Sequence, residues 1–238
     1  ITSLPGPYGI GDIGSASFNF VEFLHRAGQK YWQILPTVPT SLFFDSSPYM
    51  SSSAFAGSPL LISPDSLVQM GLLKDSDIKI KRRFSPYLTD YRQAEKFKRG
   101  LLERSYKKFS PAQDAAYRQF VRRTPWLKDY AMFMCFKEVH DNQAWTEWPK
   151  KLARRSPSAL AAAEKKYGSR IDFYLFEQYV FYRQWAELKK HADRKGIRII
   201  GDIPIYVALD SADVWAHQDI FEIHPQSLTP LRVSGVPP

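Results

Sequence analysis

The sequence has one cysteine, no long hydrophobic run and no charged-then-apolar leader at its start. The lone thiol, Cys135, cannot form an internal disulfide, and its apolar neighbours predict an unreactive core residue. No apolar stretch approaches the roughly 18 residues that a transmembrane helix needs. These absences predict a soluble, cytoplasmic protein that has no membrane partner.

The short motifs of many cofactor and metal enzymes are also missing. The glycines of GPYGIGDIG (6–14) are not followed by GK[ST] and do not stand between a strand and a helix, which argues against a nucleotide site. No GxSxG segment marks a serine nucleophile. The histidines show no HExxH or similar spacing, so we expect no metal site and no cofactor; they are His25, His140, His191, His217 and His224.

Positive charge is concentrated in residues 79–108. This stretch has eleven Lys or Arg against three Asp or Glu, a net of +8 out of the total +9, which leaves +1 for the other 208 residues. Apolar residues recur at helical spacing over 92–109, which predicts a helix with one packed face and one solvated basic face. Because Tyr87, Tyr91 and Phe97 interleave with the basic residues, nucleic-acid binding is an alternative hypothesis for this stretch.

A helix, a glycine and an apolar strand follow one another twice. We expect a helix from Ser15, as its cap, to about residue 27, then Gly28 and the strand YWQILP. A second helix from near Asp172 ends at Gly196, and the strand IRIIGDIPIYV follows it. Continuously apolar strands that alternate with helices predict an α/β fold with a parallel sheet, and the length suits all or part of a barrel.

The region between these units is predicted to be helical. Proline helix starts are expected at Ser110-Pro111, with Gln113 completing a capping box, at Thr124-Pro125 and at Ser156-Pro157. The expected organisation is therefore a first part of the barrel with a binding loop (1–74), a helical insertion (75–168), and a barrel helix, strand and loop (169–238).

Both strands are followed by segments that can carry a site. PTVPTSLFFDSSPYMSSSAFAGSP (36–59) combines hydroxyls and aromatic rings, which suits a sugar, although a surface loop of turn-forming residues has a similar composition. After the second strand come Asp202, Asp210 and Asp213. Asp202, if it lies within a buried strand, needs a polar or charged partner. Ser211 or Asp210 can cap the next helix, and Asp213 can complement the dipole of its first turn.

Six stretches, taken together and in order, resemble the amylomaltases, a family of 4-α-glucanotransferases. They are TSLPGPYGIGDIG (2–14), FVEFLHRAGQKYWQILP (20–36), SSPYMSSSAFAGSPLLI (46–62), FEQYVFYRQW (176–185), GIRIIGDIPIYVALDSADVWA (196–216) and GVPP (235–238). The resemblance implies a TIM-like (β/α)8 barrel, incomplete in this chain, with a helical insertion. It also implies transfer of α-1,4-glucan segments between maltooligosaccharides by a retaining double displacement, without metal or cofactor.

The resemblance further assigns roles to individual residues. Ser47 and Tyr49 match contacts to the donor sugar, and Asp210 matches a carboxylate that hydrogen-bonds sugar hydroxyls. Phe44 lies near the acceptor side, and Asp202 supports the site from beneath. Tyr49 and Asp210 should then converge on one glucose ring.

In the family pattern the nucleophile and the acid/base lie beyond residue 238, so no catalytic residue is assigned here. We expect a fragment that is inactive alone. A fragment that binds glucans without catalysis is the other alternative, and the oligomeric state is left open.

Overall fold

The computed structural model describes the whole chain except residues 43–44, 81–83, 86, 233–234 and 236–238. Helices dominate, and the named strands form one short parallel pair. The elements are α1 (Ser15–Arg26), β1 (Tyr31–Gln33), η2 (Pro59–Leu61), α2 (Pro64–Gln69), α3 (Tyr91–Lys108), α4 (Ala115–Arg123), α5 (Leu127–Val139), η3 (Trp145–Glu147), α6 (Lys150–Ala153), α7 (Pro157–Arg194), β2 (Arg198–Ile200) and α8 (Ala212–Ala216).

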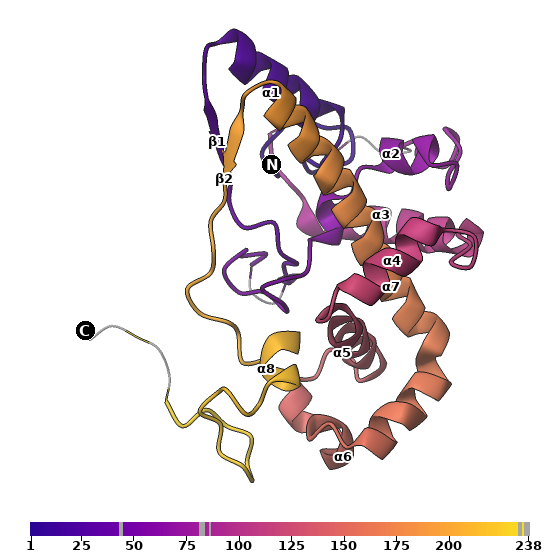
Figure 1. Cartoon of the computed structure of the whole chain (residues 1–238), viewed down its shortest axis with the longest axis vertical. Helices are drawn as coiled ribbons and strands as arrows, with labels where there is room; N and C mark the ends of the chain where they lie inside the picture. Colours follow the sequence, from indigo (N-terminus) through magenta and orange to yellow (C-terminus); the bar gives the residue numbers. More distant parts are fainter. Residues whose placement is uncertain (43–44, 81–83, 86, 233–234, 236–238) are drawn as a thin grey trace.

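Strands β1 and β2 lie side by side, and α1 and α7 each lead into one of them (Figure 1). Trp32 is opposite Ile199 at the centre of the parallel register. The N–H of Ile34 donates to the carbonyl of Ile200 at 2.9 Å and continues the pairing. The two predicted helix–glycine–strand units are therefore confirmed, and they pair as an α/β fold requires. The described residues do not close into a barrel.

The glycines between each helix and strand are required by backbone conformation. Gly28 and Gly196 both have a φ of +70°, and a Cβ at either position would meet nothing within 4 Å. The left-handed turn, and not crowding, favours glycine there. The predicted Ser15 cap is wrong, because Gly14 occupies the N-cap position and Ser15 lies inside the helix.

Helix α7 begins at Pro157, much earlier than the predicted start near Asp172. The proline start after Ser156 is confirmed. The backbone leaves helical geometry at Tyr167, with φ −116° and ψ 15°, next to Gly168. Glycine is a weak helix former, which accounts for a kink at this point. The apolar periodicity from Asp172 onward therefore predicts only the part of α7 that follows the kink.

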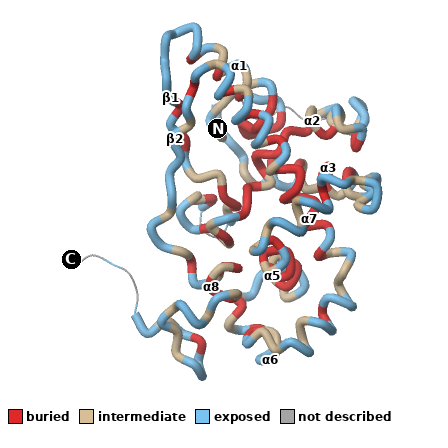
Figure 2. Tube along the Cα trace, in the orientation of Figure 1, coloured by how far each residue is buried: buried red, intermediate tan, exposed pale blue. Residues whose placement is uncertain are grey.

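The strand predicted over IRIIGDIPIYV is shorter than expected, because β2 ends at Ile200. Pro204 has no N–H for a strand ladder, and most of the segment that follows β2 is exposed (Figure 2). Asp202 therefore lies outside the strand and is exposed. The expectation that it is a buried strand carboxylate is wrong.

The capping box predicted at Ser110 is also wrong. Helix α4 begins at Ala115, and its N-cap is Asp114, whose carboxylate accepts a hydrogen bond from the N–H of Tyr117 at 2.8 Å. The same carboxylate accepts a hydrogen bond from the hydroxyl of Tyr179 on α7 at 2.9 Å. The Asp114 carboxylate therefore satisfies two donors, one in its own helix and one on α7. A local sequence pattern cannot reveal the second contact.

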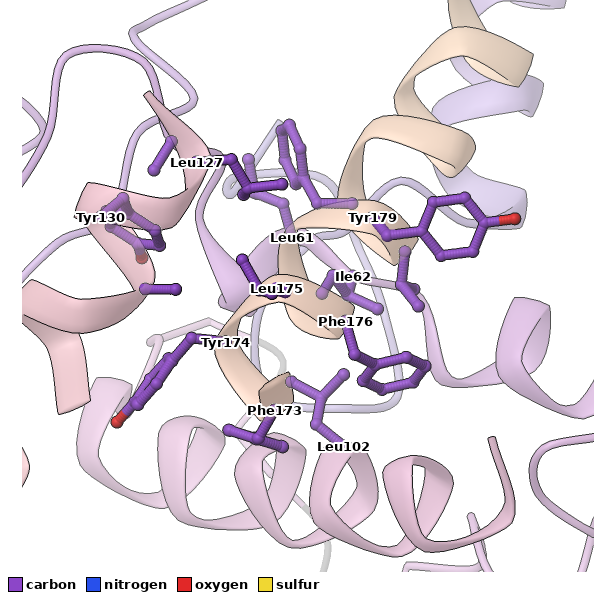
Figure 3. Packing of buried hydrophobic residues seen from close by; sticks show 14 of the residues in the cluster. Leu61, Ile62, Leu102, Leu127, Tyr130, Phe173, Tyr174, Leu175, Phe176 and Tyr179 are labelled. Atoms are coloured by element: carbon purple, nitrogen blue, oxygen red, sulfur yellow. The ribbon is translucent and has the colours of Figure 1, made fainter. Parts of the chain in front are cut away.

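One hydrophobic cluster draws residues from all three predicted segments of the chain. Leu175 and Phe176 of α7 lie among Leu61, Ile62 and Leu102 (Figure 3). Buried residues also line α5, which packs on α7 (Figure 2). Residues 75–168, the predicted helical insertion, therefore share a core with the strand-bearing parts. The boundaries at 74/75 and 168/169 stay predictions.

Lys98 ties the basic helix α3 to the beginning of the chain. It is buried, with 2% of its surface exposed, and its ammonium group donates to a carboxylate oxygen of Asp12 at 2.7 Å. It also donates to the carbonyls of Leu60 at 2.8 Å and Ile62 at 2.9 Å. All three ammonium protons are thereby used. Burial lowers the pKa of Lys98 and raises the pKa of Asp12, and the attraction within the pair opposes both shifts.

Other basic residues of α3 are also paired with carboxylates. Arg99 lies 3.2 Å from Glu138, and Arg104 and Lys108 each lie 3.8 Å from Asp77. Part of the +8 charge is therefore neutralised within the protein, and Lys98 is not on a solvated face. Nucleic-acid binding by residues 79–108 stays a hypothesis.

Cys135 is fully buried, and burial raises the pKa of its thiol to about 12. The predicted core position is confirmed, and the thiol is neutral at physiological pH. Among the described helices, none combines the length and the apolar character needed to cross a membrane.

Lys98→Met should lower the free energy of unfolding by about 3–5 kcal/mol, because it leaves Asp12 buried without its partner. Lys96→Met, on an exposed position of the same helix, should change it by less than about 0.5 kcal/mol. Urea unfolding of both variants and the parent measures the difference. Equal effects of the two substitutions would show that the buried pair does not hold α3 in place.

Candidate functional site

A cavity of about 790 Å³ lies between the loop 36–59 and the helices α3, α5 and α7. The loop supplies residues 39–42, 50–52 and 58–60, and the helices α3, α5 and α7 supply polar and apolar side chains. Asp210 also lines it. The volume is within the range of about 300–1,000 Å³ that small-molecule sites occupy. The predicted sugar-binding loop and one predicted site carboxylate therefore border the same space.

Asp210 is held by groups from a distant part of the chain. The ammonium group of Lys137 on α5 donates to its Oδ2 at 2.6 Å, and the N–H of Trp145 donates to its Oδ1 at 3.2 Å. Lys137 also donates to the carbonyls of Asn142 at 2.6 Å and Gln143 at 3.0 Å. The cap of α8 is Ser211, whose hydroxyl accepts a hydrogen bond from the N–H of Val214, so the Ser211 alternative is confirmed and the Asp210 alternative is wrong.

Tyr49 and Asp202 form a second contact near the loop. The hydroxyl of Tyr49 donates to Asp202 Oδ2 at 2.6 Å, and Asp202 Oδ1 accepts from the N–H of Ile203 at 2.8 Å. The hydrogen bond to Asp202 is the main reason that the pKa of Tyr49 is raised. The partner that Asp202 was expected to need is thus a tyrosine, and Tyr49 is still 45% exposed.

Tyr49 does not line the cavity that contains Asp210, whereas its neighbour Met50 does. Asp202 borders a smaller hollow of about 200 Å³ together with residues 34–37. Asp210 and Asp202 therefore border separate hollows, and a common glucose ring for Tyr49 and Asp210 stays a prediction.

Ser47 shapes the turn that carries Tyr49. Its hydroxyl accepts a hydrogen bond from the N–H of Tyr49 at 3.3 Å. The two preceding residues, Asp45 and Ser46, have positive φ values of 49° and 58°, a backbone that side-chain-bearing residues seldom adopt. Phe44, the predicted acceptor-side ring, lies outside the described residues.

A family model for 4-alpha-glucanotransferase matches residues 1–238. The chain belongs to the 4-alpha-glucanotransferase family. It is 41% identical to the 4-alpha-glucanotransferase of Aquifex aeolicus and 41% identical to that of Thermus thermophilus, each over 100% of this chain. It covers 48% and 47% of those proteins, so it spans about half the length of the curated relatives that it matches.

A solved relative has the same fold over the whole chain. The amylomaltase from Streptococcus agalactiae, in complex with acarbose, matches 100% of this chain with a TM-score of 0.94 and 41% identity. This chain covers 48% of that one. The amylomaltase from Corynebacterium glutamicum, at 16% identity and a TM-score of 0.64, supports the fold alone.

In this member of the 4-alpha-glucanotransferase family, Asp213 has a role that the sequence did not reveal. It lies in the first turn of α8 as predicted, but its carboxylate also accepts hydrogen bonds from the N–H of Ala54 at 2.8 Å and the hydroxyl of Ser53 at 3.4 Å. Burial raises the pKa of Asp213, and these hydrogen bonds oppose the rise. The serine-rich loop is therefore anchored to α8.

Two buried glutamines on α7 hold the end of that loop at Gly57 and the backbone after η2 at Ser63. The side-chain amide of Gln178 accepts from the N–H of Gly57 at 2.8 Å and donates to its carbonyl at 2.9 Å. Gln184 makes the same pair of contacts with Ser63, at 2.7 and 3.2 Å. A Cβ on Gly57 would lie 2.0 Å from the ring of Phe181, so glycine is needed for this close approach. The only signal in the sequence is the presence of glutamine in an apolar stretch.

Glu177 is buried on the cavity side of α7, and no sequence motif marked it as a site residue. Burial raises the pKa of its carboxyl to about 8, and the nearby charge of Arg99 opposes this rise. At neutral pH the group is therefore mostly protonated and can both donate and accept a hydrogen bond.

Glu177→Gln should reduce the loss of stability that the parent shows on going from about pH 5 to about pH 8. Between the ordinary pKa of 4.5 and the folded-state value of about 8, the folded protein keeps a proton that the unfolded chain releases. The free energy of unfolding of the parent should therefore fall as the pH rises through this window. Urea midpoints at both pH values measure the fall.

Glu187→Gln, at an exposed position on the same helix, is the matched control and should behave like the parent. If the parent and Glu177→Gln lose the same stability over this pH range, Glu177 does not titrate as the structure indicates.

Proposed function

We propose that this chain is part of a 4-α-glucanotransferase that moves α-1,4-glucan segments between maltooligosaccharides. The match of the 4-alpha-glucanotransferase family model to residues 1–238 carries the proposal. The Streptococcus agalactiae amylomaltase, solved in complex with acarbose, supports ligand binding by the shared fold. We further propose that β1 and β2 are neighbouring strands of an incomplete TIM-like barrel.

The geometry suits recognition of sugar hydroxyls by Asp210. Its contacts with Lys137 and Trp145 fix the carboxylate, and a carboxylate has lone pairs for further hydrogen bonds. A carboxylate that is already oriented loses little entropy when a ligand binds. We assign Asp210 to the hydroxyls of a bound glucose unit.

The loop supplies the remaining proposed contacts. The hydroxyl of Tyr49 is fixed by Asp202, which leaves an exposed aromatic face for the C–H face of a sugar ring. Ser47 lies in the same turn and is assigned to a donor-sugar hydroxyl. Phe44 is assigned to the acceptor side. In this assignment Asp202 acts on the sugar through Tyr49.

The proposed reaction is a retaining double displacement. One carboxylate attacks the anomeric carbon while a second carboxyl protonates the departing oxygen. The hydroxyl of the acceptor sugar then displaces the enzyme carboxylate and gives its proton to the second group. The two carboxyls must lie about 5 Å apart, and the step needs no metal ion. Each of the three candidate aspartates already accepts a hydrogen bond within the chain: Asp202 from Tyr49, Asp210 from Lys137 and Asp213 from the N–H of Ala54. These contacts support structural and binding roles for the three carboxylates. We propose that both catalytic carboxyls lie outside these 238 residues.

Asp210→Asn should weaken the binding of maltotetraose to the 238-residue chain by about 10-fold or more, because a charged acceptor is replaced by a neutral amide. Isothermal titration calorimetry measures the affinity. Asp219→Asn, at an exposed position, is the control and should bind like the parent. Undiminished binding by Asp210→Asn would remove this residue from the sugar site.

The 238-residue chain alone should release no glucose from maltotriose, since we place its nucleophile and acid/base elsewhere. A coupled glucose assay at high protein concentration makes this measurement. Glucose release would overturn the assignment of catalysis to other residues. Binding of maltotetraose without turnover also agrees with the glucan-binding alternative, whereas retention of single-stranded RNA at about 200 mM salt without sugar binding would favour the nucleic-acid hypothesis.

A further inference from the structure

The turn that follows α5 forms the part of the cavity wall next to Asp210. Residues 142–144 line the cavity together with Asp210, and Glu147 of η3 lines it further along. The N–H of Asn142 donates to the carbonyl of Lys137 at 2.7 Å, which folds the turn back onto the last turn of the helix. The turn therefore has a defined place in the structure, although the contacts predicted from the sequence all lie outside residues 75–168.

Lys137 fixes the position of this turn relative to Asp210. Its ammonium group donates to Asp210 Oδ2 at 2.6 Å and to the carbonyls of Asn142 at 2.6 Å and Gln143 at 3.0 Å. All three ammonium protons are thereby used. The carbonyl of Gln143 accepts a second hydrogen bond, from the indole N–H of Trp148 at 3.2 Å. A single cation thus holds the carboxylate and the backbone of the turn together.

Trp145 ties the end of the turn to the same segment. Its backbone N–H donates to Asp210 Oδ1 at 3.2 Å, and its indole N–H donates to the carbonyl of Leu209 at 2.7 Å. Trp145 is completely buried, so both contacts are shielded from water. Because both ends of the turn are bonded to residues 209–210, any side chain that the turn presents to the cavity has a fixed distance from the carboxylate of Asp210.

The conformation of the turn does not require the side chain of Asn142. Asp141 and Asn142 have positive φ values of 53° and 60°. Asparagine and aspartate adopt this left-handed conformation more readily than most residues, but glycine adopts it without any steric cost. Residues held in such a conformation cluster at ligand sites, where the strain is kept because the side chain has another use.

The side-chain amides of Asn142 and Gln143 are free to bind a ligand. Both residues are exposed, and within the described part of the chain neither amide has a hydrogen-bond partner. An amide has N–H donors and a carbonyl acceptor, so it can bind a hydroxyl group in either role. It is also uncharged, so its contact with a ligand does not compete with the pair of Lys137 and Asp210.

We propose that Asn142 and Gln143 are substrate-binding residues, whose side-chain amides contact hydroxyls of the same glucan that Asp210 binds, with Lys137 as the positioning residue for all three. The inference rests on the proposed function, because it takes Asp210 as a sugar-binding carboxylate. It adds the turn after α5 to the loop 36–59 and the segment after β2 as a third contributor to the site.

The test is the binding of maltotetraose to the 238-residue chain, measured by isothermal titration calorimetry. Asn142→Gly removes the amide while the backbone keeps a conformation that glycine adopts freely, and it should weaken binding by about 5-fold through the loss of one neutral hydrogen bond. Gln143→Ala should weaken binding by a similar factor. Asp141→Gly is the matched control, because it makes the same backbone change at a residue that does not line the cavity. It should bind like the parent.

Urea unfolding separates a lost contact from a lost fold. Both glycine variants should be at least as stable as the parent, because each removes a side chain from a left-handed position. A weaker affinity in Asn142→Gly at unchanged stability then reports the missing amide. Equal losses of affinity in Asn142→Gly and Asp141→Gly would point to the backbone and overturn the assignment.

The remaining outcomes distinguish this inference from the proposed function. Parent-like binding by Asn142→Gly and Gln143→Ala, in a chain whose affinity falls in Asp210→Asn, overturns the turn contacts and leaves the role of Asp210 intact. Weaker binding by these two variants, with no effect of Asp210→Asn, supports the turn contacts and removes Asp210 from the site. A parent chain that does not bind maltotetraose overturns both assignments.

Discussion

The ion pair between Lys98 and Asp12 is the contact on which the arrangement of the cavity depends. A charged side chain is stable in a protein interior only when its charge and its hydrogen-bonding groups are satisfied. Lys98 meets this requirement with one carboxylate and two backbone carbonyls, all from the first 62 residues of the chain. The pair therefore holds α3 against the residues around 12 and 60–62. Since α3 and residues 58–60 both line the cavity, one buried interaction fixes two of its walls.

Helix α7 acts as the common support for the loop and the cavity. Gln178 and Gln184 bind backbone groups at residues 57 and 63, and Glu177 faces the cavity. Residues 177 and 178 are about 100° apart around the helix axis. Glu177 therefore lines the cavity, whereas Gln178 binds the loop. Apolar residues of the same helix pack into the core (Figure 3). The part of α7 that follows Tyr167 thus supports both the loop and the cavity wall.

The three aspartates that follow β2 connect different parts of the chain to one segment. Asp202 binds Tyr49, Asp210 binds Lys137 on α5, and Asp213 binds the backbone of residue 54. These partners come from the loop 36–59 and from α5, so the stretch 202–213 connects the two. The density of carboxylates at this point is explained by these connections, and the glucan contacts proposed for Asp210 use a group that is already oriented by them.

The sequence by itself determined the local elements and the family. Gly28 and Gly196 marked helix ends, β1, α3 and the start of β2 were predicted close to their observed positions, and the ordered motifs indicated the 4-alpha-glucanotransferases. These signals are local, because backbone propensity and hydrophobic periodicity act over a few residues. The pairing of buried polar groups was decided only by the tertiary structure. Its charge predicts that Lys98 is solvated, although it is spaced four residues from Ala94 and three from Leu101 on the buried side of α3, and no motif marks Glu177. The burial of both groups depends on segments far away in the sequence and on the free energy of desolvating a charge, which no local pattern encodes.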